Sequence, residues 1–201
     1  MTHPTCVRAM LRRDVNEVVH VHLAAFPGFF LSFLGPRFLR QLYLAAVTDP
    51  SGVCHVYCED DHVLAFVVGT VEPAGFYRRL LRQRWWRFAL ASVGAVVRQP
   101  KICLRLFRAL RRPQEVPVNH DCALLMSIAV SPGLQGKGAG RRLVMRFLDE
   151  AKERRMGRVR LETDTHNNDS ANAFYQRLGF VLVGSYSSPE GRSMNEYEIA
   201  L

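Results

Sequence analysis

Apolar and polar residues follow two different periods along this chain, and these periods predict helices and strands. Apolar side chains three or four positions apart indicate helices with one buried face, whereas runs of β-branched and aromatic residues indicate strands. In the first third of the chain the predicted elements are a strand at 5–10, helices at 12–26 and 36–49, and strands at 53–59 and 62–71. The last two strands are expected to form a hairpin around Asp60-Asp61.

The second half of the chain continues this alternation. Residues 122–130 form a continuous apolar run, which is typical of a strand buried on both faces. The elements predicted after it are helices at 138–155 and 170–178 and strands at 159–163, 180–184 and 195–201. Helices that interrupt strands in this way predict an α/β fold, a mixed sheet flanked by helices. With 201 residues, 48% of them hydrophobic, the chain fits one domain over residues 1–201.

Residues 73–114 carry a concentration of positive charge. They contain eleven Lys and Arg and no Asp or Glu, whereas the rest of the chain has 16 basic and 18 acidic residues. Helices are predicted at 76–93 and 101–112, and in the second helix the basic residues lie opposite the apolar ones. The formal charge of +9 therefore belongs to one segment, which we call the basic insertion.

Several interpretations of the basic insertion remain open. It is a solvated helical cover or a homodimer interface, or it faces an anionic substrate or an anionic membrane surface. Basic amphipathic helices that contain Trp85, Trp86 and Phe88 suit the interface of a bilayer. A nucleic-acid partner is not expected, because no recognition motif accompanies the charge.

The cysteines and the N-terminal sequence indicate which cellular compartment and which kinds of site to expect. The five cysteines, Cys6, Cys54, Cys58, Cys103 and Cys122, are odd in number and scattered, so they form no disulfide framework. Cys54 and Cys58 lie about 13 Å apart in one predicted strand, beyond the reach of a disulfide or a shared metal. Without a CxxC or HExxH motif no metal is expected. We recognise no secretory signal or membrane span, which favours the cytoplasm.

The clearest chemical feature follows the strand at 122–130. A turn leads into Gln135-Gly136-Lys137-Gly138-Ala139-Gly140, directly before a predicted helix. Glycines let the backbone approach a ligand closely, and the start of a helix offers unpaired N–H groups. Lys137, Arg141 and Arg142 add positive charge, so the loop suits a diphosphate. Neither the Walker loop nor the dinucleotide fingerprint fits this spacing of glycines.

Two motifs, in order along the chain, resemble those of the GNAT superfamily of N-acetyltransferases. The loop at 135–140 is similar to the Q-x-x-G-x-G/A motif of that family. The N-x-x-A-x-x-x-Y-x-x-L-G-F motif is matched by Asn168, Ala171, Tyr175, Leu178, Gly179 and Phe180. The resemblance covers residues 122–180 well, the N-terminal elements by pattern only, and the basic insertion hardly at all. It implies a GNAT-type acyl-CoA N-acyltransferase fold with a helical insertion, and acetyl-CoA as cosubstrate.

The resemblance also implies roles for individual residues. The strand before the glycine loop parts from its neighbour, and backbone groups of Ile128 and Val130 bind the pantetheine arm and help polarise the acetyl carbonyl. Backbone amides hold the pyrophosphate, from Gln135, Gly136, Lys137, Gly138, Ala139 and Gly140. Asn168 contacts the cofactor. Tyr175 is the expected catalytic acid, because a phenol of pKa about 10 can protonate a leaving thiolate of pKa about 8.5.

The expected reaction is direct transfer of an acetyl group to a primary amine of a small molecule, without an acetyl-enzyme. An amino sugar is the preferred acceptor, because the basic insertion could face its phosphates. A peptide or protein amine, an antibiotic, and a non-catalytic CoA-binding regulatory module remain open alternatives. The function of four phenylalanines is also open, because they either pack in the core or form a wall of the acceptor site: Phe26, Phe29, Phe30 and Phe33. The base is unassigned among Glu72, Glu162, His120, Asp121, His20 and His22.

Overall fold

The computed structural model describes residues 5–76, 79, 88, 91, 121–188 and 191–201. Within these residues seven strands form one mixed sheet in the order β1-β2-β3-β4-β5-β7-β6. The strands are β1 (Thr5–Ala9), β2 (Gly52–Glu59), β3 (His62–Thr70), β4 (Cys122–Val130), β5 (Arg158–Asp164), β6 (Val181–Ser187) and β7 (Ser193–Ala200). Described neighbours pair antiparallel, except for β4 and β5, which are parallel. The predicted α/β class with a mixed sheet is confirmed.

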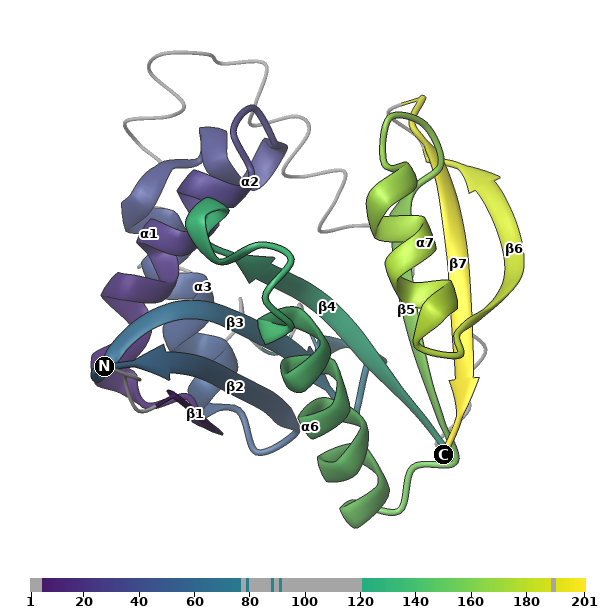
Figure 1. Ribbon diagram of the computed structural model, residues 1–201, viewed down its shortest axis with the longest axis horizontal. Coiled ribbons are helices and arrows are strands. Elements are labelled where there is room, and N and C mark those ends of the chain that lie inside the picture. The colour runs from purple at the N-terminus through teal and green to yellow at the C-terminus, as the bar shows by residue number, and fades with distance from the viewer. Residues whose placement is uncertain (1–4, 77–78, 80–87, 89–90, 92–120, 189–190) are drawn as a thin grey trace.

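Helices cover both faces of this sheet (Figure 1). They are α1 (Val15–Ala25), α2 (Phe30–Phe33), α3 (Gly35–Thr48), α6 (Ala139–Glu153) and α7 (Asp169–Arg177), with short 3-10 turns at Arg12–Asp14 and Pro132–Leu134. Alternate residues of a strand face opposite sides. Val56 and Phe66 therefore pack with α1 and α3, whereas Tyr57 and Val67 pack with α6. Each face of the sheet thus forms a hydrophobic core of its own with the helices that cover it.

The predicted elements agree with the structure except at two places. The helix α2 was not predicted, because its four residues are too short to show a helical period. The strand β6 continues to Ser187, beyond the predicted end at Gly184, because it pairs with β7 as far as Ser193. Among the described residues no helix is long and apolar enough to cross a bilayer.

The basic insertion lies outside the described residues except at seven positions (73–76, 79, 88 and 91), so its two predicted helices are not described. Two of these positions are informative. Phe88, which suited a bilayer interface in the sequence, is only 4% exposed, and its ring lies 5.2 Å from that of Phe38 in α3. Phe76 is buried in the same core. At these two positions the chain therefore packs against the side of the sheet that α1 and α3 cover.

The parallel pair β4 and β5 separates part-way along its length. The two strands pair only from Cys122 opposite Arg158 to Leu125 opposite Leu161. Beyond that point β4 stays paired with β3 up to Val130, and β5 stays paired with β7. An irregularity in the pairing of β4 with β3 falls at the same place, between Leu125 and Ser127. The ribbons consequently diverge toward the glycine loop (Figure 1), as the resemblance implies.

Candidate functional site

The gap between β4 and β5 is bordered by unpaired backbone groups. The N–H of Ser131 donates to the carbonyl of Leu64, 2.8 Å away on the β3 side. Successive residues of a strand direct their peptide groups to opposite sides. The backbone groups of Val130 and Ile128 therefore point away from β3, toward the side where β5 has left. This is the edge at which the sequence predicted that an extended ligand binds.

The glycine loop presents further amides at the end of this edge. Gly136 and Gly138 have φ angles of 77° and 84°, in the left-handed region that glycine adopts most easily. Gln135 and Lys137 use their N–H groups inside the loop, on carbonyls 3.4 and 3.3 Å away. The remaining predicted amides, of Gly136, Gly138, Ala139 and Gly140, donate to no described carbonyl. Unpaired amides at the N-terminus of a helix are groups that suit an anion.

A basic groove of about 570 Å³ opens beside this loop. Lys137 and Gly138 line it together with Arg141, Arg142 and Arg146 of α6. Such charge around a helix N-terminus favours phosphate groups. The sequence analysis missed Arg146, although its position one helical turn after Arg142 could have indicated it.

Tyr175 lies on α7 and is 7% exposed. Its ring packs against those of Phe180 and Tyr197, with centroids 5.7 and 6.3 Å away. The hydroxyl bonds to no described residue. Burial raises the pKa of Tyr175 above its ordinary value, which keeps the phenol protonated. Tyr175 therefore has a proton to donate at neutral pH.

Asn168 ties the start of α7 to β5. Its side-chain amide donates to the hydroxyl of Thr163, and its backbone carbonyl accepts from the N–H of Asn172 at 3.0 Å. The structure thus shows Asn168 holding α7 against the strand that borders the gap. Its contact with a cofactor stays a prediction.

Glu162 is the first residue of β5 beyond the last pair with β4. Its carboxylate is exposed and accepts a hydrogen bond of 2.6 Å from the hydroxyl of Tyr186. Glu72, by contrast, follows Thr70, which pairs with Leu124 where β4 and β5 are still joined. Glu72 therefore lies at the end where β4 and β5 are joined, away from the gap.

The other candidate bases lie elsewhere. Asp121 bonds the N–H of Gly157 at 2.5 Å, at the joined end of β4 and β5. His20 is exposed on α1, and His120 lies outside the described residues. His22 is only 3% exposed, and its Nδ1 lies 2.6 Å from the hydroxyl of Tyr43. Of the candidates that the structure describes, Glu162 alone borders the diverging strands.

His22 instead makes the stability of the fold depend on pH. Burial lowers its pKa to about 4 in the folded protein, against about 6.5 in the unfolded chain. The unfolded chain takes up the proton first, so the free energy of unfolding should fall between pH 6.5 and pH 4, by up to about 3 kcal/mol. Urea unfolding at pH 7 and pH 5 tests this. His22→Leu should flatten the dependence, whereas the exposed-site control His20→Leu should keep it; an equal slope in all three proteins would contradict the assignment.

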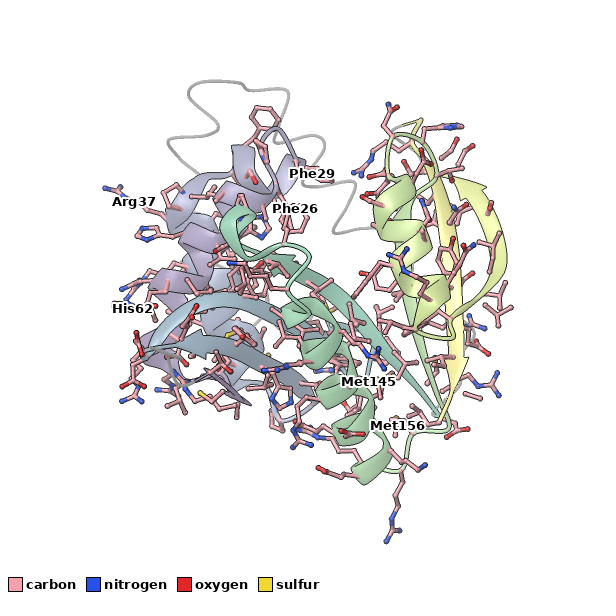
Figure 2. The ribbon with its side chains drawn as sticks, viewed as in Figure 1. Phe26, Phe29, Arg37, His62, Met145 and Met156 are labelled. Atoms are coloured by element: carbon pink, nitrogen blue, oxygen red, sulfur yellow. The ribbon has the colours of Figure 1, made fainter. Side chains whose placement is uncertain are left out.

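Aromatic residues meet the C-terminal half at the open end of the gap. Figure 2 shows Phe26 and Phe29 at the end of the molecule where the strands diverge. Phe26 is half-buried, whereas Phe29 is 42% exposed and lies under the guanidinium of Arg192, 5.5 Å from the ring centroid. Arg192 in turn donates to Asp164 at the end of β5, at 2.9 Å. Phe29 therefore forms part of a wall across the opening, and Phe33, 55% exposed, is not core either.

Comparisons with known proteins agree with this geometry. The family model described as "Acetyltransferase (GNAT) family" matches residues 16–180. N-alpha-acetyltransferase RimI of Mycobacterium tuberculosis is 48% identical over 58 residues, 29% of this chain and 34% of that protein. Streptothricin acetyltransferase of Streptomyces lavendulae is 39% identical over 74 residues, 37% of this chain and 39% of that protein. The matched part thus spans little more than a third of these curated relatives.

A solved structure is similar over almost the whole chain. Ard1 from Thermoplasma volcanium superposes with a TM-score of 0.64 at 17% identity, and the match covers 98% of this chain and 97% of that one. At this identity the likeness concerns the fold alone. It extends to the N-terminal elements, which the sequence motifs did not reach.

Proposed function

The chain belongs to the acetyltransferase (GNAT) family, and from this premise we propose that it is an N-acetyltransferase that moves the acetyl group of acetyl-CoA directly to a primary amine. The separation of β4 and β5 carries the proposal. It leaves a row of backbone groups that runs from Ile128 to the loop amides that donate to no described carbonyl. Such a row suits an extended ligand with a diphosphate at one end.

The proposed mechanism gives each group one task. The backbone at Ile128 and Val130 holds the pantetheine arm, and an N–H on this edge stabilises the developing oxyanion. Glu162 accepts a proton from the ammonium of the acceptor, which frees the amine to attack the thioester carbonyl. As the C–S bond breaks, Tyr175 donates its hydroxyl proton to the leaving thiolate, and the new amide nitrogen loses its surplus proton, which returns Tyr175 to the protonated form. Direct transfer needs no cysteine, and neither motif contains one.

For the acceptor we propose a small amine, with amino sugars as the first class to test. The exposed carboxylate of Glu162 supports a cationic acceptor beside the gap. The preference for a sugar rests on the charge of the basic insertion. The names of the two curated relatives add an α-amine and streptothricin as alternatives. The scattered cysteines support a cytoplasmic setting.

The proposal is tested first by isothermal titration of the purified protein with acetyl-CoA. Micromolar binding should be followed by release of free CoA thiol when a panel of amines is added. The panel contains an amino sugar, a polyamine, a peptide with a free N-terminus and streptothricin. Binding without thiol release for any amine would favour the CoA-binding regulatory module. No binding by folded protein would overturn the cofactor site.

Replacing Glu162 with glutamine should lower kcat/KM about 30-fold at pH 7, because the variant cannot accept the ammonium proton. The deficit should shrink as the pH approaches the pKa of the acceptor amine, since an unprotonated amine needs no base. The matched control is Glu196→Gln, which removes the same charge from the residue opposite Glu162 on β7. A deficit that stays constant with pH, or one that the control shares, would remove Glu162 from this role.

A further inference from the structure

Cys6 and Cys58 lie directly opposite each other on the neighbouring strands β1 and β2. Four residues along the ladder, Met10 donates its N–H to the carbonyl of Cys54 at 2.9 Å. Because hydrogen-bonded pairs alternate along antiparallel strands, Cys6 and Cys58 also form such a pair, with Cα atoms about 5.5 Å apart. A disulfide spans Cα distances of about 4.4–6.8 Å. The backbone is therefore already at bonding distance.

The side chains are placed for the same reaction. Residues directly opposite in an antiparallel sheet project from the same face, so the thiols of Cys6 and Cys58 lie on one face of the β1–β2 pair. The two cysteines differ in access, since Cys6 is exposed and Cys58 is 1% exposed. An oxidant in solution can thus reach one sulfur but not the other.

The charge around the pair supports a division of roles. Burial raises the pKa of the Cys58 thiol to about 11, and the guanidinium of Arg8 opposes that increase. Arg8 projects from the same face of β1 as Cys6 and is held by Asp14, with atoms 2.9 Å apart in one of two hydrogen bonds. The Cys58 thiol therefore stays protonated at neutral pH, and the exposed Cys6 is the sulfur that an oxidant meets first.

The other described cysteines have no such partner. Cys54 lies opposite Val68 on β3, and Cys122 lies opposite Arg158 on β5. In the described residues the opposition of two cysteines occurs at this pair alone. The sequence could not show it, because 51 residues separate the two positions along the chain.

We propose that Cys6 and Cys58 form a reversible cross-strand disulfide, a modification site that takes a hydroperoxide as its oxidant. The sulfur of Cys6 attacks the peroxide, the O–O bond breaks, and an alcohol or water leaves, which gives a sulfenic acid. The sulfur of Cys58 then attacks that of Cys6. The S–S bond forms, the S–O bond breaks, and the hydroxide leaves as water with the proton of Cys58. A dithiol restores both thiols.

The bond would fasten the edge strand that borders the basic groove. The neighbours of Cys6 on β1 turn to the opposite face of the sheet. There Thr5 accepts a hydrogen bond from Arg142 at 3.3 Å, and Val7 lines the groove. Oxidation therefore acts on the strand that supports one wall of that groove.

The test counts thiols in the full chain. Reduced protein, freed of reductant, is treated with hydrogen peroxide and titrated in denaturant; it should lose two of its five thiols and regain them with dithiothreitol. Cys6→Ser should lose none, whereas the matched control Cys54→Ser should still lose two. Cleavage after Tyr57 separates Cys54 from Cys58, so peptide mass spectrometry of the wild-type protein identifies the bond even where a variant does not fold.

Three results would overturn the proposal. The wild-type protein keeps all its thiols, the peptide map places the bond at other cysteines, or a non-reducing gel shows dimers linked through Cys6. Thermal unfolding is a second test of the disulfide. A bond between Cys6 and Cys58 should raise the Tm by roughly 5 °C, because it constrains the unfolded chain. An unchanged or lower Tm in protein that has lost two thiols would also contradict it.

Discussion

Replacing Tyr175 with phenylalanine is expected to lower kcat by at least about 100-fold while the Kd for acetyl-CoA changes less than about twofold. The hydroxyl bonds to no described residue, so its removal breaks no contact seen in the fold. Its proton, however, is the one that the leaving thiolate needs. Because burial raises the pKa of Tyr175, the phenol stays protonated through the neutral range, and activity should show no loss from its ionisation there. Steady-state kinetics and titration of both proteins with acetyl-CoA measure the two effects.

A neighbouring tyrosine supplies the matched control. Tyr197 is 1% exposed in the same core, with its ring 6.3 Å from that of Tyr175. Tyr197→Phe should leave kcat within about threefold, because its hydroxyl makes only a long contact of 3.5 Å with Gln176. Equal losses in the two variants would indicate a packing effect. Full activity of Tyr175→Phe would assign the proton to another donor.

Replacing Gly138 with aspartate should weaken acetyl-CoA binding about 100-fold, which is roughly 2.7 kcal/mol. No atom lies within 4 Å of a Cβ at this position, so the side chain meets no clash, although the φ of 84° strains any residue other than glycine. The side chain lies at the residue that caps α6, and aspartate is a good cap. Its carboxylate therefore competes for the helix amides that the diphosphate needs and repels the phosphates. Isothermal titration measures the change in Kd.

Two further variants separate charge from backbone strain. Gly138→Asn meets the same φ of 84° without the charge, and asparagine tolerates that region, so it should cost about 10-fold. Gly133→Asp adds the same charge in the turn before the loop, where a Cβ also meets no atom within 4 Å, and it should cost less than about threefold. If Gly133→Asp weakens binding as much as Gly138→Asp, the anion does not bind at the start of α6.

The periodicity of the sequence was sufficient for most elements, because local spacing alone decides which face of a helix or strand is apolar. The run at 122–130 became β4, and the stripe of Leu143, Phe147 and Leu148 packs under α6 as expected. Local spacing could not predict where a strand or a strand pair ends, because that depends on the pairing partner. The end of β6 depends on β7, and the end of the β4 pairing with β5 depends on how two sheet halves pack.

The candidate site divides in the same way. The glycine loop and the residues around Tyr175 are contiguous motifs, so their presence could be read from the chain. Which loop amides stay available was not readable, since it depends on hydrogen bonds such as that of Lys137 to Leu134. The sequence also could not distinguish Glu162 from Glu72 as the candidate base. Both lie near the end of a predicted strand, and only the pairing of the strands shows which end of the sheet each residue occupies.

The family, the glycine loop and the burial pattern of the strands could be read from the chain, because each depends on residues close together in sequence. The point where β4 and β5 part, the contact of Arg192 with Phe29 across the opening, and the opposition of Cys6 and Cys58 became visible only in the folded protein. These are contacts between residues far apart in sequence. They exist only once the register of the sheet and the packing of both cores bring those residues together.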